Sequence, residues 1–225
     1  MKERSSVVVE EYLQVIYSLL SNNKPVKAVN LVKWLKSSPS TVHATLSRMS
    51  RDGLILIGGK KEISLTDDGF LQAETLTRRH RLVETFLCDT LGISWHEVHA
   101  HAHVLEHGLT PLIEEKLAEF LGFPKVCPHG TPLPGEDSHL PNDLVSLDSV
   151  EAGSKIQIVI IDKSLEESAK LLKFLQEKNI VPGQQHYVTE KMDVTKTIIL
   201  ETGEETAILT FDIAAEIGVI VVPET

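Results

Sequence analysis

Histidine and glutamate residues recur at helical spacing in the middle of the chain. His99, His103 and His107 are four residues apart, and Glu106 lies three residues after His103. Side chains separated by three or four residues share one face of an α-helix. Imidazole nitrogens and carboxylate oxygens bind divalent cations, so the spacing predicts a metal-binding face.

The same two residue types form a second pair upstream. His80 and Glu84 are four residues apart, and two antiparallel helices that face each other through these residues would surround a cation. The competing interpretation is a histidine-rich helix surface in contact with solvent. Five histidines between residues 96 and 107 make that interpretation poor, although His96 and His101 fall off the shared face and are expected to be surface residues.

Histidine and glutamate clusters also occur in zinc hydrolases, where the bound ion activates a water molecule. The hydrolytic HExxH spacing is missing from the run WHEVHAHAHVLEHG. A metal-dependent hydrolase and a metal-buffering adaptor protein remain the alternative functions at this point.

The chain contains only two cysteines, Cys88 and Cys127. Two cysteines are too few for a disulfide framework and are consistent with a reducing compartment. Cys88 lies in an apolar run and is expected to be a small buried side chain. Cys127 lies two residues before His129 in the sequence CPHG, where packing alone gives little reason for a thiol beside an imidazole.

Charge is divided unevenly along the chain. The net charge of −10 arises from +4 in residues 1–79 and −14 in residues 80–225. DNA binding depends largely on neutralising phosphates, so a basic first third suits DNA and an acidic remainder suits cations. Glu10, Glu11 and Gln14 interrupt the apolar N-terminal stretch, which argues against a signal peptide or a membrane span and predicts a cytoplasmic protein.

The first third has the pattern of a winged helix-turn-helix. Apolar residues at helical spacing predict a helix over about residues 5–22, a short helix within 24–36, and a further helix after the breaker SSPS. Two β-rich runs then flank a basic GGKK tip at residues 58–61, which is typical of a hairpin, or wing. A small winged helix can also be a protein-interaction module, but the basic tip favours DNA.

The helix after SSPS is the predicted DNA-reading helix. Ser38 or Ser40 can cap it, while Val42, Leu46 and Met49 face inward. Its first turns would present side chains to base edges, and the arginines and wing lysines suit phosphates. The predicted DNA contacts are Ser38, Ser40, Thr41, His43, Ala44, Arg48, Arg51, Lys60 and Lys61.

The middle of the chain is predicted to be helical and to end in a linker. A long helix is predicted from a cap at Thr66 or Asp67 to Gly92. Further helix opens at Ser94, where Glu97 completes a capping-box pattern. Residues 124–142 contain five prolines, which predicts a linker or an irregular loop.

The last part of the chain, residues 144–225, contains five strand-like segments and one helical segment. An arrangement of this size suggests a small barrel that resembles an SH3 domain. The helical region before it has an apolar face that is expected to serve core and dimer packing. The members of this face are Val104, Leu105, Leu109, Leu112, Ile113, Leu117 and Phe120.

Together these motifs resemble the diphtheria-toxin-repressor family of iron- and manganese-dependent regulators. The resemblance extends over nearly the whole chain and is carried by EEYLQVIYSL, SSPSTVHATLSRMSRDGLI, LTDDG, RRHRLVETFL, VHAHAHVLEHGL and CPHGTPLPG. It implies an α+β multidomain protein. Its parts would be a winged helix-turn-helix DNA-binding domain over residues 1–74, an all-α dimerisation and metal-binding domain over 75–142 with a proline-rich linker from 124, and an SH3-like (FeoA-type) β-barrel over 143–225.

The resemblance also implies two metal sites. The first would take Glu11, His103, Glu106 and His107. The second would take His80, Glu84 and His99 or, as in relatives with a CPH motif, Glu84, Cys127 and His129. In the latter set an acidic residue of the last domain would be a further ligand, and Asp162 is the candidate.

Iron-sensing members of the family often have Met at the position of Glu11 and Cys at the position of His103. Carboxylate oxygen and imidazole nitrogen are harder ligands than the sulfur of Met and Cys, and harder ligands suit Mn²⁺. Mn²⁺ is therefore the predicted metal, with Fe²⁺ and Zn²⁺ as alternatives. The implied protein is a homodimeric repressor and not an enzyme. It would bind a pseudopalindromic operator in double-stranded DNA when its sites are filled, and would control metal-homeostasis genes.

Overall fold

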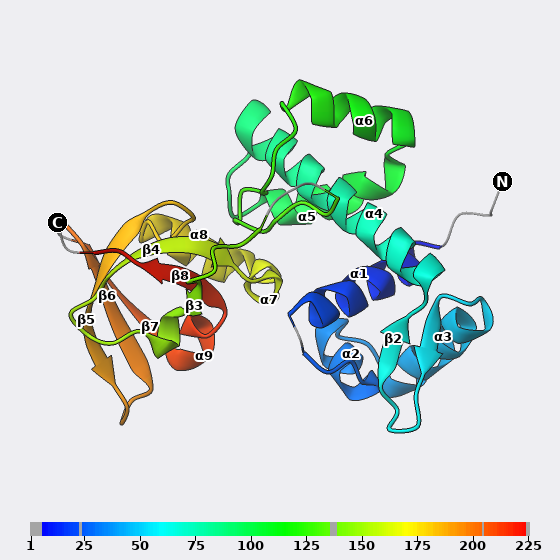
Figure 1. The fold of residues 1–225 in the computed structure, drawn as a ribbon, viewed down its shortest axis with the longest axis horizontal. Coiled ribbons are helices and arrows are strands. Elements are labelled where there is room, and N and C mark those ends of the chain that lie inside the picture. The colour runs from blue at the N-terminus through cyan, green and yellow to red at the C-terminus, as the bar shows by residue number, and fades with distance from the viewer. Residues whose placement is uncertain (1–5, 23, 136–138, 204, 224–225) are drawn as a thin grey trace. The chain divides into compact units, whose positions relative to one another are not determined.

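The chain is divided into two compact units, Met1–His80 and Arg81–Thr225 (Figure 1). The computed structural model describes residues 6–22, 24–135, 139–203 and 205–223. Residues 136–138 of the predicted linker lie outside these ranges. None of the described helices has an apolar stretch of membrane-spanning length.

The first unit is a winged helix-turn-helix, which confirms the prediction. Its elements are α1 (Val7–Ser21), α2 (Ala28–Trp34), α3 (Pro39–Arg51), β1 (Ile55–Ile57), β2 (Ile63–Leu65) and most of α4 (Asp67–Thr85). The two strands pair antiparallel, with Ile57 opposite Ile63 beside the basic tip. Leu13, Ile16 and Leu31 are fully buried in its core.

Local sequence explains where α3 and α4 begin. The Ser38 hydroxyl accepts a hydrogen bond from the Thr41 amide at 3.1 Å, so Ser38 is the N-cap of α3. The Thr66 hydroxyl accepts one from the Gly69 amide at 3.0 Å at the start of α4. Val42, Leu46 and Met49 of α3 lie in the core, as their helical spacing predicts.

Gly69, in the first turn of α4, lies against the backbone just before β1. A Cβ at this position would lie 1.9 Å from the Leu54 carbonyl oxygen, whereas a Cβ at Gly59 in the wing tip would meet no atom within 4 Å. We expect Gly69→Ala to lower the free energy of unfolding by about 1–3 kcal/mol, the usual cost of overpacking. Denaturant unfolding measures this, with Gly59→Ala as the control, and equal stability of the two variants would contradict the packing argument.

The second unit starts with the end of α4, which passes into a π-helical turn, η1 (Phe86–Thr90), and stops near Gly92 as predicted. Next come α5 (Val98–Leu105), the 3₁₀ turn η2 (Glu106–Gly108) and α6 (Pro111–Phe120). The helical run is thus interrupted before Pro111, which has no amide hydrogen for a preceding helix. Thr110 is the N-cap of α6, because its hydroxyl accepts a hydrogen bond from the Ile113 amide at 3.3 Å.

The predicted capping box at Ser94 is wrong. Helix α5 begins at Val98 with Glu97 as its N-cap residue and without a side-chain cap. Ser94 accepts the Glu97 amide through its backbone carbonyl at 2.8 Å, which forms a turn ahead of the helix.

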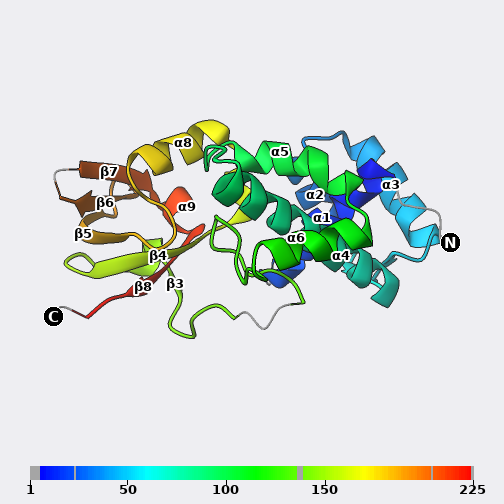
Figure 2. The ribbon, with the colours of Figure 1, turned by 90° about the horizontal axis from the view of Figure 1, so that it is seen from above.

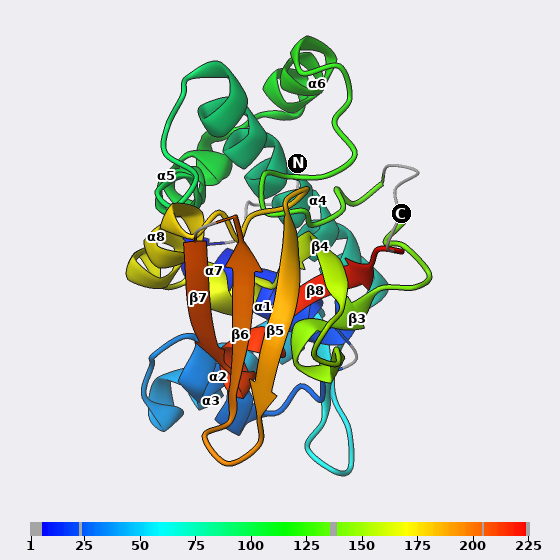
Figure 3. The same cartoon turned by 90° about the vertical axis from the view of Figure 1, so that its left-hand side faces the viewer.

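The rest of the second unit contains a six-stranded antiparallel sheet with the strand order β3-β8-β4-β5-β6-β7, which Figure 3 shows from one side. Helix α8 lies over this sheet (Figure 2). Its Leu172 and Leu175 belong to the same hydrophobic core as the buried residues of the strands. The strands are β3 (Val145–Ser146), β4 (Lys155–Ile161), β5 (Gln185–Met192), β6 (Thr197–Thr202), β7 (Glu205–Thr210) and β8 (Ile217–Val221). The helices are η3 (Leu147–Ser149), α7 (Lys163–Glu166), α8 (Ala169–Glu177) and α9 (Phe211–Ala214).

This sheet confirms the prediction of a small SH3-like β domain, with two differences. The short strand β3 and helix α9 were not expected. The one predicted helix is two helices, α7 and α8, because the Ser168 hydroxyl accepts a hydrogen bond from the Leu171 amide at 3.4 Å and caps a new helix. The break leaves Glu166 as the last residue of α7.

Candidate metal centre

The CPHG sequence forms a tight turn held against strand β4. The Gly130 amide donates to the Cys127 carbonyl at 2.9 Å and closes the turn, and the His129 carbonyl accepts from the Ile161 amide at 2.9 Å. Gly130 has a φ of +83°, and a Cβ there would lie 2.0 Å from the Val159 carbonyl oxygen. Glycine is therefore required both for the turn and for its close approach to β4.

Side chains from four segments meet beside this turn. We name them the buried cluster: Glu84 of α4, His99 of α5, Cys127 and His129 of the turn, and Glu166 of α7. His99 Nδ1 lies 3.1 Å from Glu84 Oε1 and 3.2 Å from Glu166 Oε2. His129 Nδ1 lies 3.6 Å from Glu84 Oε1 and 3.7 Å from Glu166 Oε1. Each carboxylate therefore faces both imidazoles.

Burial and ion pairing shift the pKa values of these groups. Burial by itself would lower the pKa of His129, but the charges of Glu166 and Glu84 raise it well above its usual value. Burial likewise opposes a charge on His99, yet side-chain hydrogen bonds, the strongest to Glu166, raise the pKa of His99 well above its usual value. Burial would raise the pKa of Glu166, but the charge of His129 holds it below its usual value. The two carboxylates therefore favour the protonated form of both imidazoles.

The donor set of the buried cluster fits a divalent cation. Both ring nitrogens of His129 are buried, and they make no hydrogen bond within the described part of the chain. Buried polar groups without hydrogen bonds are rare, and a bound ion is one explanation for them. Ligands held about 2.0–2.3 Å from one ion lie about 3–4 Å apart. The distances from His129 to the two carboxylates lie in this range.

The structure joins the two ligand sets that the sequence left as alternatives. His99 and His129 approach the same oxygen of Glu84, so one buried cluster contains members of both sets. The carboxylate of the last domain that faces these histidines is that of Glu166, which was not selected from the sequence, and a role for Asp162 as a ligand remains a prediction. The Asp162 carboxylate accepts from the Ser164 amide at 2.9 Å as the N-cap of α7.

Glu166 was missed because the sequence DKSLEE offers several carboxylates at similar positions. The short helix α7 decides which of them faces the histidines. The proximity of an acidic run to the predicted end of β4 was the available signal, but it did not distinguish the members of that run.

Two predicted ligands belong to the first unit. His80 is buried on α4, one helical turn before Glu84 and therefore on the same helix face. Glu11 is half-buried on α1. The participation of both residues in metal binding remains a prediction from the sequence.

Three further predicted ligands meet at the end of α5. We name His103, Glu106 and His107 the α5 cluster. His103 Nδ1 and His107 Nε2 each lie 3.4 Å from Glu106 Oε1. The Glu106 side chain is fully buried, whereas that of His103 is 41% exposed. The helix tightens into the 3₁₀ turn η2 at Glu106, and the three side chains still lie together. The Glu106 carboxylate thus lies within reach of both imidazoles.

The predicted DNA contacts lie on α3 and in the wing. Those exposed to solvent are Ser38, Ser40, Thr41, His43, Ala44, Arg51, Lys60 and Lys61. Arg48 differs, because it is half-buried and its guanidinium donates to the Ser6 hydroxyl at 3.2 Å. This contact links α3 to the start of α1, and a phosphate contact of Arg48 remains a prediction from the sequence.

The wing lysines provide a test of the DNA surface. We expect the double variant Lys60→Ala, Lys61→Ala to weaken binding to all duplexes and to reduce the slope of log K against log salt by about 2, since each lost phosphate contact removes about one. Binding isotherms at several salt concentrations measure this slope. Lys170→Ala, Lys173→Ala on α8 is the control pair, and a wild-type slope in the wing variant would contradict a phosphate contact.

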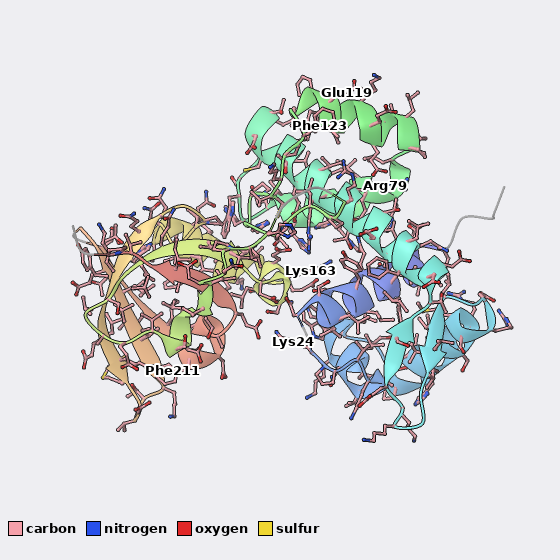
Figure 4. All side chains as sticks on the ribbon, viewed as in Figure 1. Lys24, Arg79, Glu119, Phe123, Lys163 and Phe211 are labelled. Atoms are coloured by element: carbon pink, nitrogen blue, oxygen red, sulfur yellow. The ribbon has the colours of Figure 1, made fainter. Side chains whose placement is uncertain are left out.

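Much of the predicted apolar face is exposed in the single chain. Its members with the most exposed side chains are Val104, Leu105, Leu112, Ile113 and Phe120. Phe123, labelled in Figure 4 just after α6, is also more than half exposed. Exposed apolar residues gathered on two consecutive helices are typical of a protein interface.

Models of two domain families match this chain. The model described as "Iron dependent repressor, N-terminal DNA binding domain" matches residues 6–63. The model described as "Iron dependent repressor, metal binding and dimerisation domain" matches residues 66–135.

Two relatives and one solved structure are similar to this chain over most of its length. The chain is 31% identical over 220 residues to the iron-dependent repressor IdeR of Mycobacterium leprae, a match that covers 93% of this chain and 95% of that protein. It is 27% identical over 190 residues to the diphtheria toxin repressor of Corynebacterium diphtheriae, covering 81% and 84%. The solved structure of a manganese-dependent transcriptional repressor in complex with manganese has a TM-score of 0.82 and 28% identity, covering 95% of this chain and 100% of that one.

Proposed function

We propose that this chain, which belongs to the diphtheria-toxin-repressor family of iron- and manganese-dependent transcription repressors, senses a divalent cation through its two clusters. The buried cluster carries the proposal. It combines three kinds of metal ligand, and the donor atoms of Glu84, Cys127 and His129 lie within 4.8 Å of one another. The relatives described above are transcription repressors, so we propose regulation rather than hydrolysis or metal buffering.

Two sets of residues would hold the cations. The buried cluster would supply its carboxylates, imidazoles and thiol, with His80 as a further ligand from the same face of α4 as Glu84. The α5 cluster would supply Glu106 with its two histidines, and Glu11 of the first unit would complete this set.

Mn²⁺ is the proposed cation, with Fe²⁺ and Zn²⁺ as the alternatives. The ligand set of Glu11 with the α5 cluster contains oxygen and imidazole nitrogen but no sulfur, and such sites suit Mn²⁺ better than thiolate sites do. The manganese complex of the similar repressor supports the same choice. Zn²⁺ still has the higher intrinsic affinity for nearly any such site, so selectivity would depend on geometry and on availability in the cell.

The proposed mechanism joins the DNA-reading unit to the dimer-forming unit. One cation would be bound by the carboxylates of both Glu11 and Glu106. Glu11 belongs to α1, which packs on the DNA-reading helix α3 through the shared core. Glu106 belongs to the segment between α5 and α6. A common ligand for both carboxylates would restrict the orientation of the reading helix, with a coupling free energy of about 1–3 kcal/mol.

A dimer would present two such reading helices. The exposed apolar residues of α5 and α6 would form its interface, in agreement with the dimerisation domain that the family model describes. Two copies of α3 fit a pseudopalindromic operator whose half-sites lie about one helical turn, or a multiple of it, apart. Because the target is promoter DNA, we expect the protein to act in the cytoplasm.

Binding to duplex DNA with and without Mn²⁺ tests the proposal. We expect Mn²⁺ to tighten binding to duplexes from metal-homeostasis promoters much more than binding to random duplexes, at a stated salt concentration. Equal binding to both kinds of duplex, or no response to Mn²⁺, Fe²⁺ or Zn²⁺, would contradict a metal-dependent repressor.

A further inference from the structure

Trp95 lies between η1 and α5 and contacts the CPHG turn in two ways. Its indole Nε1 donates a hydrogen bond to the Pro128 carbonyl at 2.9 Å. Its ring lies against the imidazole of His129, with the ring centroids 4.7 Å apart and the planes tilted by 49°. One side chain thus contacts both the peptide group before His129 and the ring of His129.

Trp95 is also a member of the hydrophobic core of the C-terminal sheet. It is 8% exposed and belongs to the cluster that contains Leu165 of α7 and Leu172 of α8. The next residue, His96, places its Nδ1 2.7 Å from Gln176 Oε1 of α8. The segment before α5 is therefore attached to the same domain that supplies Glu166.

Other contacts of the turn restrain its backbone, and the two carboxylates attract Nδ1 of His129. The His129 carbonyl is held by the Ile161 amide, and Gly130 approaches β4 closely. Neither ring nitrogen of His129 makes a hydrogen bond among the described residues. The contact with the Trp95 ring adds to the ion pairs with Glu84 and Glu166, because it restricts rotation of the imidazole from its face.

We propose that Trp95 is a positioning residue for the buried cluster: it orients His129 and the turn that carries Cys127 toward Glu84 and Glu166. The inference rests on the proposed function of this cluster in cation binding. Groups that orient metal ligands without binding the metal themselves typically change metal affinity 10- to 100-fold when they are lost. Trp95 has the two properties that such a group needs, a hydrogen bond to the ligand-bearing turn and burial that keeps its own side chain in place.

Calorimetric titration of the full-length protein with Mn²⁺ tests this role. Trp95→Phe keeps a ring beside His129 and removes the N–H donor, and we expect it to weaken one binding event about tenfold, at the lower end of the range for outer-shell groups. Trp95→Leu removes the ring contact as well and should weaken it further. Trp34→Phe is the matched control, since Trp34 lies in α2 of the first unit, and it should leave the affinity unchanged.

Two spectroscopic measurements separate positioning from a merely structural role. Co²⁺ bound to a thiolate gives a near-ultraviolet charge-transfer band, which should be present in the wild type and weaker in Trp95→Phe if Cys127 is no longer well oriented. The chain has two tryptophans. In Trp34→Phe protein all indole emission therefore comes from Trp95, and paramagnetic Mn²⁺ on the adjacent imidazole should quench it with the same midpoint as the calorimetric event.

The outcomes distinguish this inference from the proposed function. Wild-type protein that binds no cation at the buried cluster would contradict the proposed function. Wild-type binding together with an unchanged affinity and Co²⁺ band in a folded Trp95→Phe variant would overturn the role of Trp95 alone. If the Trp95 variants do not fold, the Trp34→Phe titration still decides, because Trp95 emission that ignores bound Mn²⁺ would also overturn the inference.

Discussion

A Glu106→Gln substitution is expected to abolish Mn²⁺-stimulated operator binding while leaving a folded dimer. Glu106 is fully buried, and both His103 Nδ1 and His107 Nε2 lie 3.4 Å from its Oε1. Glutamine has nearly the same shape but no negative charge, so it removes the carboxylate that faces the two imidazoles. Loss of a direct ligand should cost more than the 10- to 100-fold loss of affinity that follows removal of an outer-shell partner.

Calorimetry and gel-shift titration measure the two halves of this prediction. Calorimetry should show that one Mn²⁺ binding event is lost or weakened beyond about 100-fold. Gel-shift titration should show the same weak operator binding with and without Mn²⁺. Glu11→Ala and His103→Ala should behave in the same way if both residues share this site.

Glu115→Gln is the matched control for Glu106→Gln. Glu115 is exposed on α6, so the exchange removes the same charge from the same domain without touching the α5 cluster. It should keep the wild-type response to Mn²⁺. A Glu106→Gln protein that responds to Mn²⁺ as the wild type does would show that the α5 cluster is not the regulatory site.

Glu166→Gln and Asp162→Asn are expected to have opposite outcomes although the residues are only four positions apart. Glu166 Oε1 and Oε2 face His129 and His99, whereas the Asp162 carboxylate accepts a hydrogen bond from the Ser164 amide. Glu166→Gln should weaken binding at the buried cluster by about 100-fold or more, because a direct ligand is lost. Asp162→Asn should bind Mn²⁺ as the wild type does, since Asn caps helices as well as Asp.

The two variants can be compared directly, because Glu166→Gln and Asp162→Asn each remove one negative charge from the same short segment. A general electrostatic effect would therefore weaken binding equally in both variants. Thermal unfolding of the cation-free proteins provides the control for folding. The reverse result, with Asp162→Asn weak and Glu166→Gln normal, would restore the ligand that the sequence favoured and overturn the geometry of the buried cluster.

Local sequence rules predicted much of the fold. Polar caps, glycines and alternating apolar patterns act within a few residues of one another, so the chain alone placed Gly92 at a helix end and narrowed two helix starts to Ser38 or Ser40 and to Thr66 or Asp67. The wing followed from two β-rich runs around a glycine-rich tip. The rules failed where two signals competed, as at Ser94 and Glu97, where a preceding turn displaced the expected cap.

The sequence by itself determined the residue types of the metal site. So many His, Glu and Cys residues at helical or turn spacing are unusual in a segment that does not bind metal. It also determined the DNA-reading helix, whose inward and outward faces follow from helical period. Only the tertiary structure decided which distant carboxylate meets the histidines. That choice depends on the break between α7 and α8 and on the seating of the CPHG turn against β4 and Trp95, and contacts between residues far apart in the chain are not encoded in local spacing.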